Sequence, residues 1–108
     1  MTTYFIDCSE KEIAVILYGE AYDEQNQRVG RYTRQSELKH GRPYYLNDHG
    51  NQSVWFMTND DGGYWGVGDF DDYGTSHVGL KSTTVDSCPT NLKYQYYSDL
   101  NNHGSYVD

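Results

Sequence analysis

Apolar and polar positions in this chain form short runs in which the two kinds often alternate, a pattern typical of β-strands. Most runs are bounded by Gly, Asn, Asp or Pro, the residues that favour turns. The only helix candidate, Ser9–Leu17, is dominated by "IAVIL", whose β-branched residues favour a strand. The runs predicted as strands are Tyr4–Cys8, Glu12–Tyr18, Val29–Thr33, Pro43–Leu46, Gln52–Thr58, Gly63–Val67, His77–Leu80 and Leu92–Tyr97.

The number and spacing of these runs predict an all-β fold, a small antiparallel sandwich or barrel of about seven or eight short strands. A chain of 108 residues has the length of one domain, so we expect residues 1–108 to form a single β binding module. No linker, low-complexity tract or internal repeat interrupts it.

The alternation within two strands predicts which side chains share a face. In the run at 52–58 both faces are apolar, so this strand is either covered on both sides or carries a binding face. In the run at 63–68, Trp65 and Val67 share one face and are predicted to point into the core. Tyr64 points the other way, above bare glycine backbone, where another ring or a ligand could lie.

Charge and hydropathy narrow the classes of partner. The formal net charge of −8 would repel a phosphate backbone, so nucleic acid and anionic membrane surfaces are not expected partners. No apolar run reaches the roughly eighteen residues of a membrane span. The first residues, "MTTYFIDCSEKE", lack the basic and apolar regions of a secretory leader, so we expect none within this chain.

Two cysteines, Cys8 and Cys88, lie near opposite ends of the predicted fold. A disulfide between them would close a long loop, stabilise the fold by roughly 4 kcal/mol and imply an oxidising compartment. Two reduced, buried thiols are the alternative. The tripeptide "NQS" at 51–53 fits an N-glycosylation acceptor, which agrees with a secreted or extracellular location.

Six short motifs occur in one order along the chain and carry a resemblance to a known module. They are "GRY" at 30–32, "HGRPYY" at 40–45, "VWFM" at 54–57, "GGYWGVGD" at 62–69, "VGL" at 78–80 and "CPTNLKY" at 88–94. Together they resemble a small, often repeated β-module with the pattern G-x-Y, N-G-R-P-x-Y and W-x-[IV]-G, found in multidomain proteins of algae, oomycetes and marine invertebrates.

The resemblance covers roughly residues 13–99 and implies a small β-fold more than a function. His40 stands where the module usually has Asn, and Tyr94 where it has a late Trp. Because Cys8 and Cys88 lie at the edges of the resemblance, a disulfide between them would tie both ends to the sheet, and we expect it to form.

Motifs for catalysis are weak, and we expect no catalytic residues and no enzyme. "GTSHVG" at 74–79 has one residue too many for a nucleophile elbow, and no strand-to-helix turn is predicted there. The four histidines show no zinc-binding spacing. Sixteen acidic residues could include a catalytic pair, but their sequence spacing does not define a distance in space.

The stretch "GGYWGVGDFDDYG" at 62–74, with the residues just before it, combines aromatic rings with acids. An aromatic ring beside Asp, Asn and Arg groups is the usual make-up of a sugar site on loops at the end of a sheet. Arg42, between Gly41 and Pro43, presents five donors, either to the loop itself or to a ligand. The predicted ligand-binding residues are Asn59, Asp60, Asp61, Tyr64 and Arg42.

A second acidic group, Asp69, Asp71 and Asp72, follows the same strand. These carboxylates could begin a calcium site, since calcium takes six to eight oxygen ligands. Solvated turn acids are the alternative, and no other cofactor is expected.

These observations predict a non-enzymatic, lectin-like module that binds carbohydrate or glycoprotein outside the cell. The alternative is a structural, self-assembling protein. Twelve tyrosines and few lysines would then let sheet faces and edges meet in a homo-oligomer.

Overall fold

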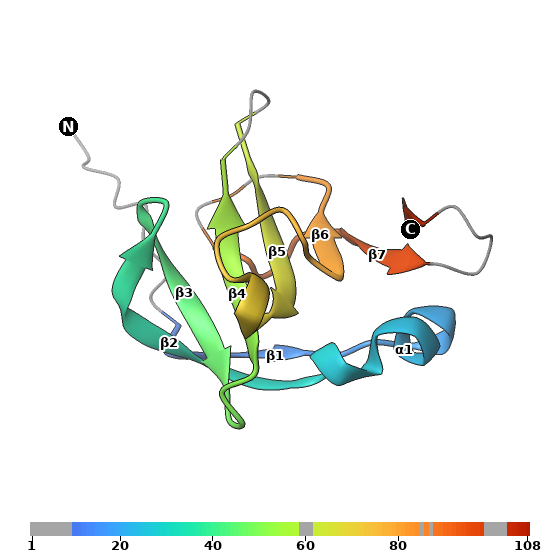
Figure 1. Cartoon of the computed structure of the whole chain (residues 1–108), viewed down its shortest axis with the longest axis horizontal. Coiled ribbons are helices and arrows are strands. Elements are labelled where there is room, and N and C mark those ends of the chain that lie inside the picture. Colours follow the sequence, from blue (N-terminus) through green and yellow to red (C-terminus); the bar gives the residue numbers. More distant parts are fainter. Residues whose placement is uncertain (1–9, 59–61, 85, 87, 99–103) are drawn as a thin grey trace.

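Figure 1 shows the computed structural model, which describes residues 10–58, 62–84, 86, 88–98 and 104–108. Within these residues, eight strands form one antiparallel sheet that curls into a half-barrel (Figure 1). The order in the sheet is the order in the chain, so each strand is hydrogen-bonded to its neighbours in sequence. The strands are β1 (Glu12–Val15), β2 (Gly30–Lys39), β3 (Arg42–Asn47), β4 (Gln52–Met57), β5 (Tyr64–Asp69), β6 (Leu80–Ser82), β7 (Tyr94–Ser98) and β8 (Ser105–Val107). The predicted all-β fold is confirmed.

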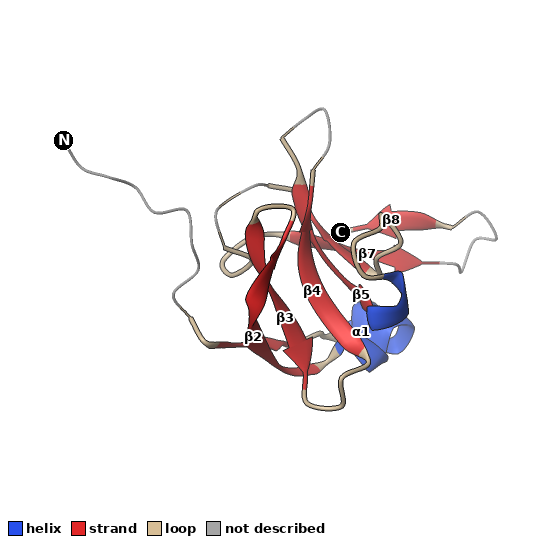
Figure 2. Ribbon diagram, turned by 60° about the vertical axis from the view of Figure 1, so that its left-hand side comes forward, coloured by secondary structure: helices blue, strands red, loops and turns tan. Residues whose placement is uncertain are grey.

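Short helical segments lie in two of the connections between these strands. The helix α1 (Gly19–Gln25) and the 3-10 turn η1 (Asn26–Arg28) lie between β1 and β2, and η2 (Phe70–Asp72) follows β5. The sequence did not predict α1, and Figure 2 shows it beside β7. Gln25 Nε2 donates to the Tyr97 carbonyl at 2.8 Å and so fixes the end of α1 to β7. No helix within the described ranges is long and apolar enough to span a membrane.

Several strand boundaries differ from the prediction. The strand predicted at Tyr4–Cys8 lies outside the described residues. β6 begins only at Leu80, three residues later than predicted, because the segment before it is wrapped over the sheet. β8 was not predicted.

The tight β2–β3 turn places His40 and Gly41 between the paired residues Lys39 and Arg42. Both turn residues have positive φ, +53° and +82°, as a type I′ turn requires. Asn and Gly adopt this conformation with least strain, so His40 occupies a position that favours Asn.

The main core lies on one face of the sheet. Trp65 is fully buried there and meets Phe56 edge-on, with 5.5 Å between ring centroids. Its indole nitrogen donates to the Asp86 carbonyl at 3.0 Å, so burial leaves no polar atom of the ring unsatisfied. The core residues are Ile13, Tyr32, Tyr45, Val54, Phe56, Trp65, Val67, Leu80 and Tyr96. The prediction that Trp65 and Val67 face the core is confirmed.

A second apolar cluster lies on the opposite face, made by Tyr44, Trp55, Tyr64 and Val78. The segment 70–79 covers it, with Tyr73 packed against Tyr44 at 4.7 Å between centroids. β4 is therefore covered on both sides, the first of the two predicted alternatives. Tyr64 does point away from Trp65, but it is only 8% exposed. The expectation that its ring stands open to a ligand is wrong, because alternation along β5 cannot show that another segment covers that face.

Candidate functional site

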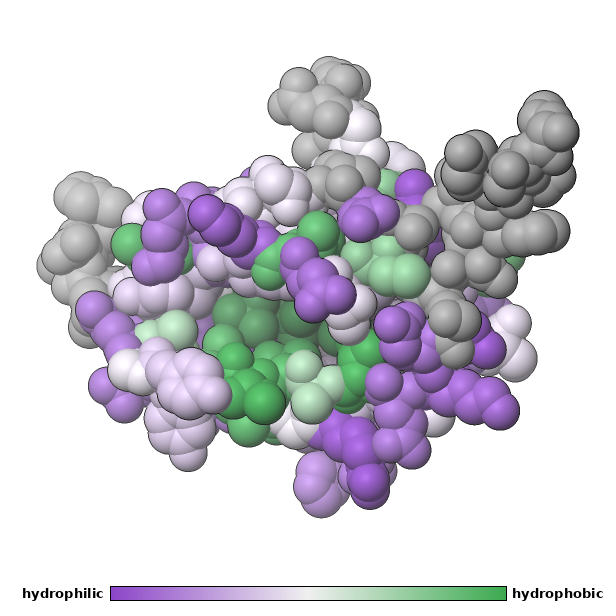
Figure 3. Space-filling model, turned by 180° about the vertical axis from the view of Figure 1, so that it is seen from behind, coloured by the Kyte–Doolittle hydropathy of each residue, from purple (hydrophilic) through white to green (hydrophobic). Residues whose placement is uncertain are grey.

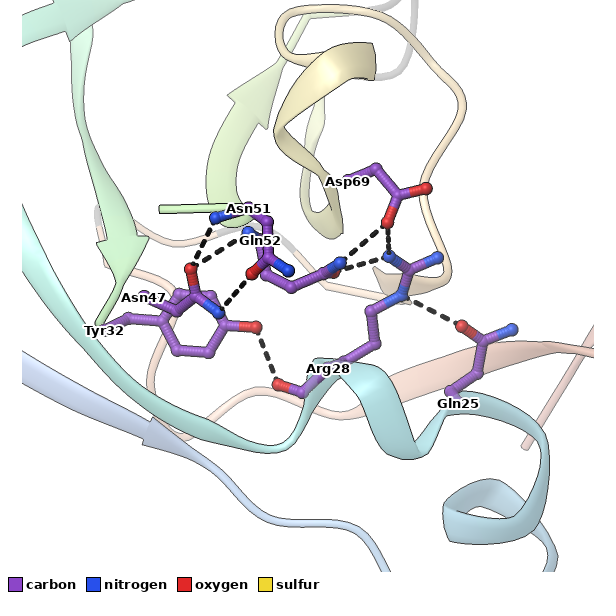
Figure 4. A network of polar contacts seen from close by, with 7 residues as sticks. All are labelled: Gln25, Arg28, Tyr32, Asn47, Asn51, Gln52 and Asp69. Carbon is purple, nitrogen blue, oxygen red and sulfur yellow. Dashed lines mark hydrogen bonds and ion pairs between the residues drawn. The ribbon is translucent and has the colours of Figure 1, made fainter. Parts of the chain in front are cut away.

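Arg28 lies at the centre of a polar network at the junction of η1 and β2 (Figure 4). Its side chain is only 10% exposed, although its guanidinium is charged. Nε donates to Gln25 Oε1 at 3.0 Å, and Nη1 donates to Gln52 Oε1 at 2.5 Å and to Asp69 Oδ1 at 2.7 Å. These partners from α1, β4 and β5 compensate the charge that burial would otherwise destabilise.

Asp69 supplies the counter-charge at the end of β5. Its Oδ1 also accepts from Gln52 Nε2 at 2.7 Å. That hydrogen bond, followed by the hydrogen bond from Arg28 and the attraction of its charge, lowers the pKa of the Asp69 carboxyl below its ordinary value. The carboxylate is therefore ionised at neutral pH and pairs with Arg28.

The β3–β4 turn and the start of β2 hold the network in place. Asn47 Oδ1 accepts from the backbone N–H groups of Asn51 and Gln52, at 3.0 Å each, and so orients the first residue of β4. The buried Tyr32 hydroxyl donates to the Arg28 carbonyl at 2.6 Å. Hydrogen bonds to both the side chain and the backbone carbonyl of Arg28 thus position its guanidinium.

An open pocket of about 450 Å³ adjoins the network. It is lined by Gln25, Arg28, Asp72, Ser76, His77, Val78, Gly79, Tyr97 and Tyr106. A side chain at Gly79 would overlap Gln25 Oε1 and the Arg28 guanidinium, so only glycine lets these groups lie against the backbone. Arg28 Nη2 has no hydrogen-bond partner among the described residues and remains open to solvent. Its two N–H groups are fixed donors available to a ligand in this pocket.

Two tyrosines form the aromatic part of the pocket. Tyr97 and Tyr106 pack edge to face, with 5.5 Å between ring centroids. The Tyr106 hydroxyl donates to the Val78 carbonyl at 2.7 Å, whereas Tyr97 is 37% exposed. Tyr97 therefore offers ring surface to a ligand while Tyr106 supports it.

The pocket also contains Ser76, His77 and Asp72, three residue types found in nucleophilic enzymes. No hydrogen bond joins their side chains to one another within the described part of the chain. A nucleophile needs a base within hydrogen-bond reach, and that base needs an orienting group. The arrangement is suited to hydrogen-bonding a ligand rather than to activating a serine.

Of the predicted ligand-binding residues, the structure describes Arg42 and Tyr64, and it places them on opposite faces of the sheet. Asn59, Asp60 and Asp61 lie outside the described residues. Arg42 stacks on Phe56, with its Cζ 4.4 Å from the ring centroid, on the main-core face of the sheet. Tyr64 belongs to the cluster on the opposite face. Arg42 Nη1 is buried without a partner among the residues that the structure describes.

The three predicted calcium ligands, Asp69, Asp71 and Asp72, have different surroundings in the structure. Asp69 is bound by Arg28 and Gln52, whereas Asp71 and Asp72 belong to the following turn η2. In the described ranges, no three or more His, Cys, Asp or Glu side chains form a group that could hold a metal ion.

Cys88 forms a disulfide and packs against the main core. Cys8 lies outside the described residues, so the pairing of these two cysteines stays a prediction.

The sequence reasoning missed Arg28, Gln25 and Tyr97. Arg28 follows "NQ" and lies just before a predicted strand, a context in which a charged residue is normally solvated. The one signal in the sequence is that Arg28 is the first basic residue after the acidic stretch at 19–27, which contains no Lys or Arg. Comparisons with protein-family models, curated proteins and solved structures give no match to this chain.

Proposed function

We propose that this protein is a non-enzymatic, extracellular module that binds a saccharide, free or on a glycoprotein, in the Arg28 pocket. The observation that carries the proposal is the free Nη2 donor of a buried, rigidly held arginine beside an exposed tyrosine ring. Sugars are bound by such combinations, in which an aromatic ring contacts the C–H face and polar groups bond the hydroxyls. The pocket replaces the Tyr64 loop as the proposed site.

Two further features support the proposal. The pocket opens at strand ends and is lined partly by the segment 76–79 between β5 and β6, as binding sites on rigid scaffolds usually are. The Cys88 disulfide supports an oxidising compartment, where glycans are abundant. The resemblance to the repeated β-module adds a fold and no ligand.

A glycan array followed by titration tests the proposal. Labelled protein is applied to the array, and hits are titrated while backbone amide resonances are recorded. Tyr97→Ala should weaken binding at least about tenfold, in line with the loss of one stacking ring. Tyr22→Ala removes another exposed tyrosine, in α1, that does not line the pocket, and this variant should bind as the wild type does. An array without hits, or equal binding by both variants, refutes the proposal.

Self-assembly is the second candidate function, and the free sheet edges favour it. β1 and β8 end the strand order, so each has an edge without a partner strand among the described residues. Beside β1, Ile16 and Tyr18 are 63% and 80% exposed. Figure 3 shows an apolar hollow on the back of the molecule, and an apolar groove of about 350 Å³ is lined by residues 13–17 of the β1 segment and by residues 89–92.

Edge pairing through β1 would produce oligomers whose size depends on protein concentration. Light scattering over a hundredfold range of concentration measures this directly. Ile16→Lys places a charge beside the edge and should dissociate such an oligomer without changing saccharide binding. A monomer at every concentration refutes self-assembly and leaves the saccharide proposal standing.

A further inference from the structure

The charges around the Arg28 pocket do not favour an anion. Asp69 lies 2.7 Å from Arg28 Nη1 and neutralises the guanidinium. Asp72 lines the same pocket and adds a negative charge that forms no ion pair among the described residues, in a chain whose formal net charge is −8. Lys81, whose Nζ lies 5.2 Å from the Tyr106 ring centroid, does not itself line the pocket. Among the lining residues and their ion pair, two carboxylates therefore face one guanidinium, so an anionic ligand would meet repulsion from Asp72 at close range, where solvent screening is weakest.

The geometry of the guanidinium points the same way. Arginine recognises carboxylate, sulfate and phosphate best through two parallel hydrogen bonds from neighbouring nitrogens. Here Nε is bound to Gln25, and Nη1 is bound to Gln52 and Asp69. Both two-nitrogen edges of the guanidinium are thereby blocked, and only Nη2 remains, with two N–H groups on one nitrogen.

Each N–H group of Nη2 can donate to one oxygen acceptor of a neutral ligand. A hydroxyl or amide carbonyl oxygen can accept from Nη2 without bringing a second charge into the pocket. The Asp72 carboxylate can in turn accept from a hydroxyl group of the same ligand. Tyr97 supplies the apolar wall against which a sugar ring packs.

We propose that the ligand of this pocket is an uncharged saccharide, held by one hydroxyl or carbonyl oxygen on Arg28 Nη2, and that Asp69 and Asp72 select against uronic and sulfated sugars. This inference rests on the proposed saccharide function and specifies its ligand class.

Matched pairs of oligosaccharides test the selection, each pair sharing one backbone and differing only in charge. Suitable pairs are methyl-esterified and de-esterified oligogalacturonates, and neutral oligosaccharides with their sulfated derivatives. Dissociation constants are measured by calorimetry at about 0.15 M salt, where the Debye length is roughly 8 Å. The neutral member should bind at least about tenfold more tightly than its anionic counterpart.

Two variants distinguish local selection from the overall charge of the chain. Asp72→Asn removes the pocket carboxylate and should reduce the neutral-to-anionic affinity ratio at least about threefold. Asp71→Asn removes the neighbouring charge, which is exposed and does not line the pocket, and should leave that ratio unchanged. Unfolding curves confirm that both variants fold.

The outcomes separate the two levels of the proposal. Equal or tighter binding of the anionic members overturns the ligand class and leaves a saccharide-binding function in place. An equal effect of both Asn variants also overturns the local selection by Asp72. Failure of every saccharide, neutral or anionic, overturns the proposed function and this inference together.

Discussion

Replacing Asp69 by Asn tests how far the stability of the fold depends on the charge pair at its centre. The change keeps the oxygen acceptor for Gln52 and Arg28 but removes the charge 2.7 Å from Arg28 Nη1. Breaking a fully buried pair costs about 3–5 kcal/mol. Because the Asp69 side chain is 51% exposed, solvent screening reduces the expected loss of unfolding free energy to about 1–2 kcal/mol at neutral pH.

The Arg28–Asp69 pair should also make the free energy of unfolding depend on pH. Hydrogen bonds from Gln52 and then Arg28 lower the pKa of the Asp69 carboxyl in the folded protein, whereas in the unfolded chain it is about 3.9. A carboxyl whose pKa is lower in the folded state contributes its full stabilisation above the unfolded value. That contribution is lost as the pH falls below about 4 towards the folded value.

Urea unfolding followed by tryptophan fluorescence, at pH values from 7 to about 2.5, measures both effects. The wild type should be more stable than Asp69→Asn at pH 7, and the two free energies should converge as the carboxyl is protonated. Asp71→Asn, in the next turn, should follow the wild type throughout. A constant difference between wild type and Asp69→Asn across this range would show that the charge of Asp69 is not what stabilises Arg28.

Further predictions concern the core, the β2–β3 turn and the cysteines. Trp65→Ala should cost about 3–5 kcal/mol of unfolding free energy, and Tyr64→Ala should also destabilise clearly, since both rings are buried; urea unfolding measures both. His40→Asn should raise the unfolding free energy by up to about 1 kcal/mol, because Asn adopts the positive φ of the turn with less strain. The predicted Cys8–Cys88 disulfide should give a mass gain of two hydrogens on reduction; two thiols that react with maleimide in the native protein would contradict it.

The strands that sequence reasoning predicted best are those whose alternation is flanked by strong turn residues. β4 and β5 match their predictions closely, because "VWF" and "YWGV" alternate between two apolar faces. The helix α1 escaped prediction because "GEAYDEQ" has no apolar stripe and no side-chain cap. Its position depends on Gln25 and its bond to Tyr97, a contact that the local sequence does not reveal.

The candidate site was harder to predict than the fold, for a physical reason. Alternation places Tyr64 on the correct face, but its ring is buried in a cluster with Val78 and Tyr106, which come from later parts of the chain, and Lys81 Nζ lies 4.9 Å from its ring centroid. Arg28 is buried only because Gln52 and Asp69 arrive from distant strands to compensate it. The burial of Tyr64 and of Arg28 both result from tertiary contacts. The composition and spacing of the nearby sequence therefore do not predict them.

The order of strands in the sheet also influences the order in which parts of the chain can fold. Because every strand is hydrogen-bonded to its neighbours in sequence, each pairing closes a loop that is short compared with the whole chain and so has a modest closure entropy. The bond between Gln25 Nε2 and the Tyr97 carbonyl instead joins groups 72 residues apart and requires β2–β7 to be in place first. We therefore expect this closure to form after the rate-limiting step. A Gln25→Ala change should accordingly accelerate unfolding while leaving the folding rate nearly unaltered, the behaviour of a position with a φ-value near zero.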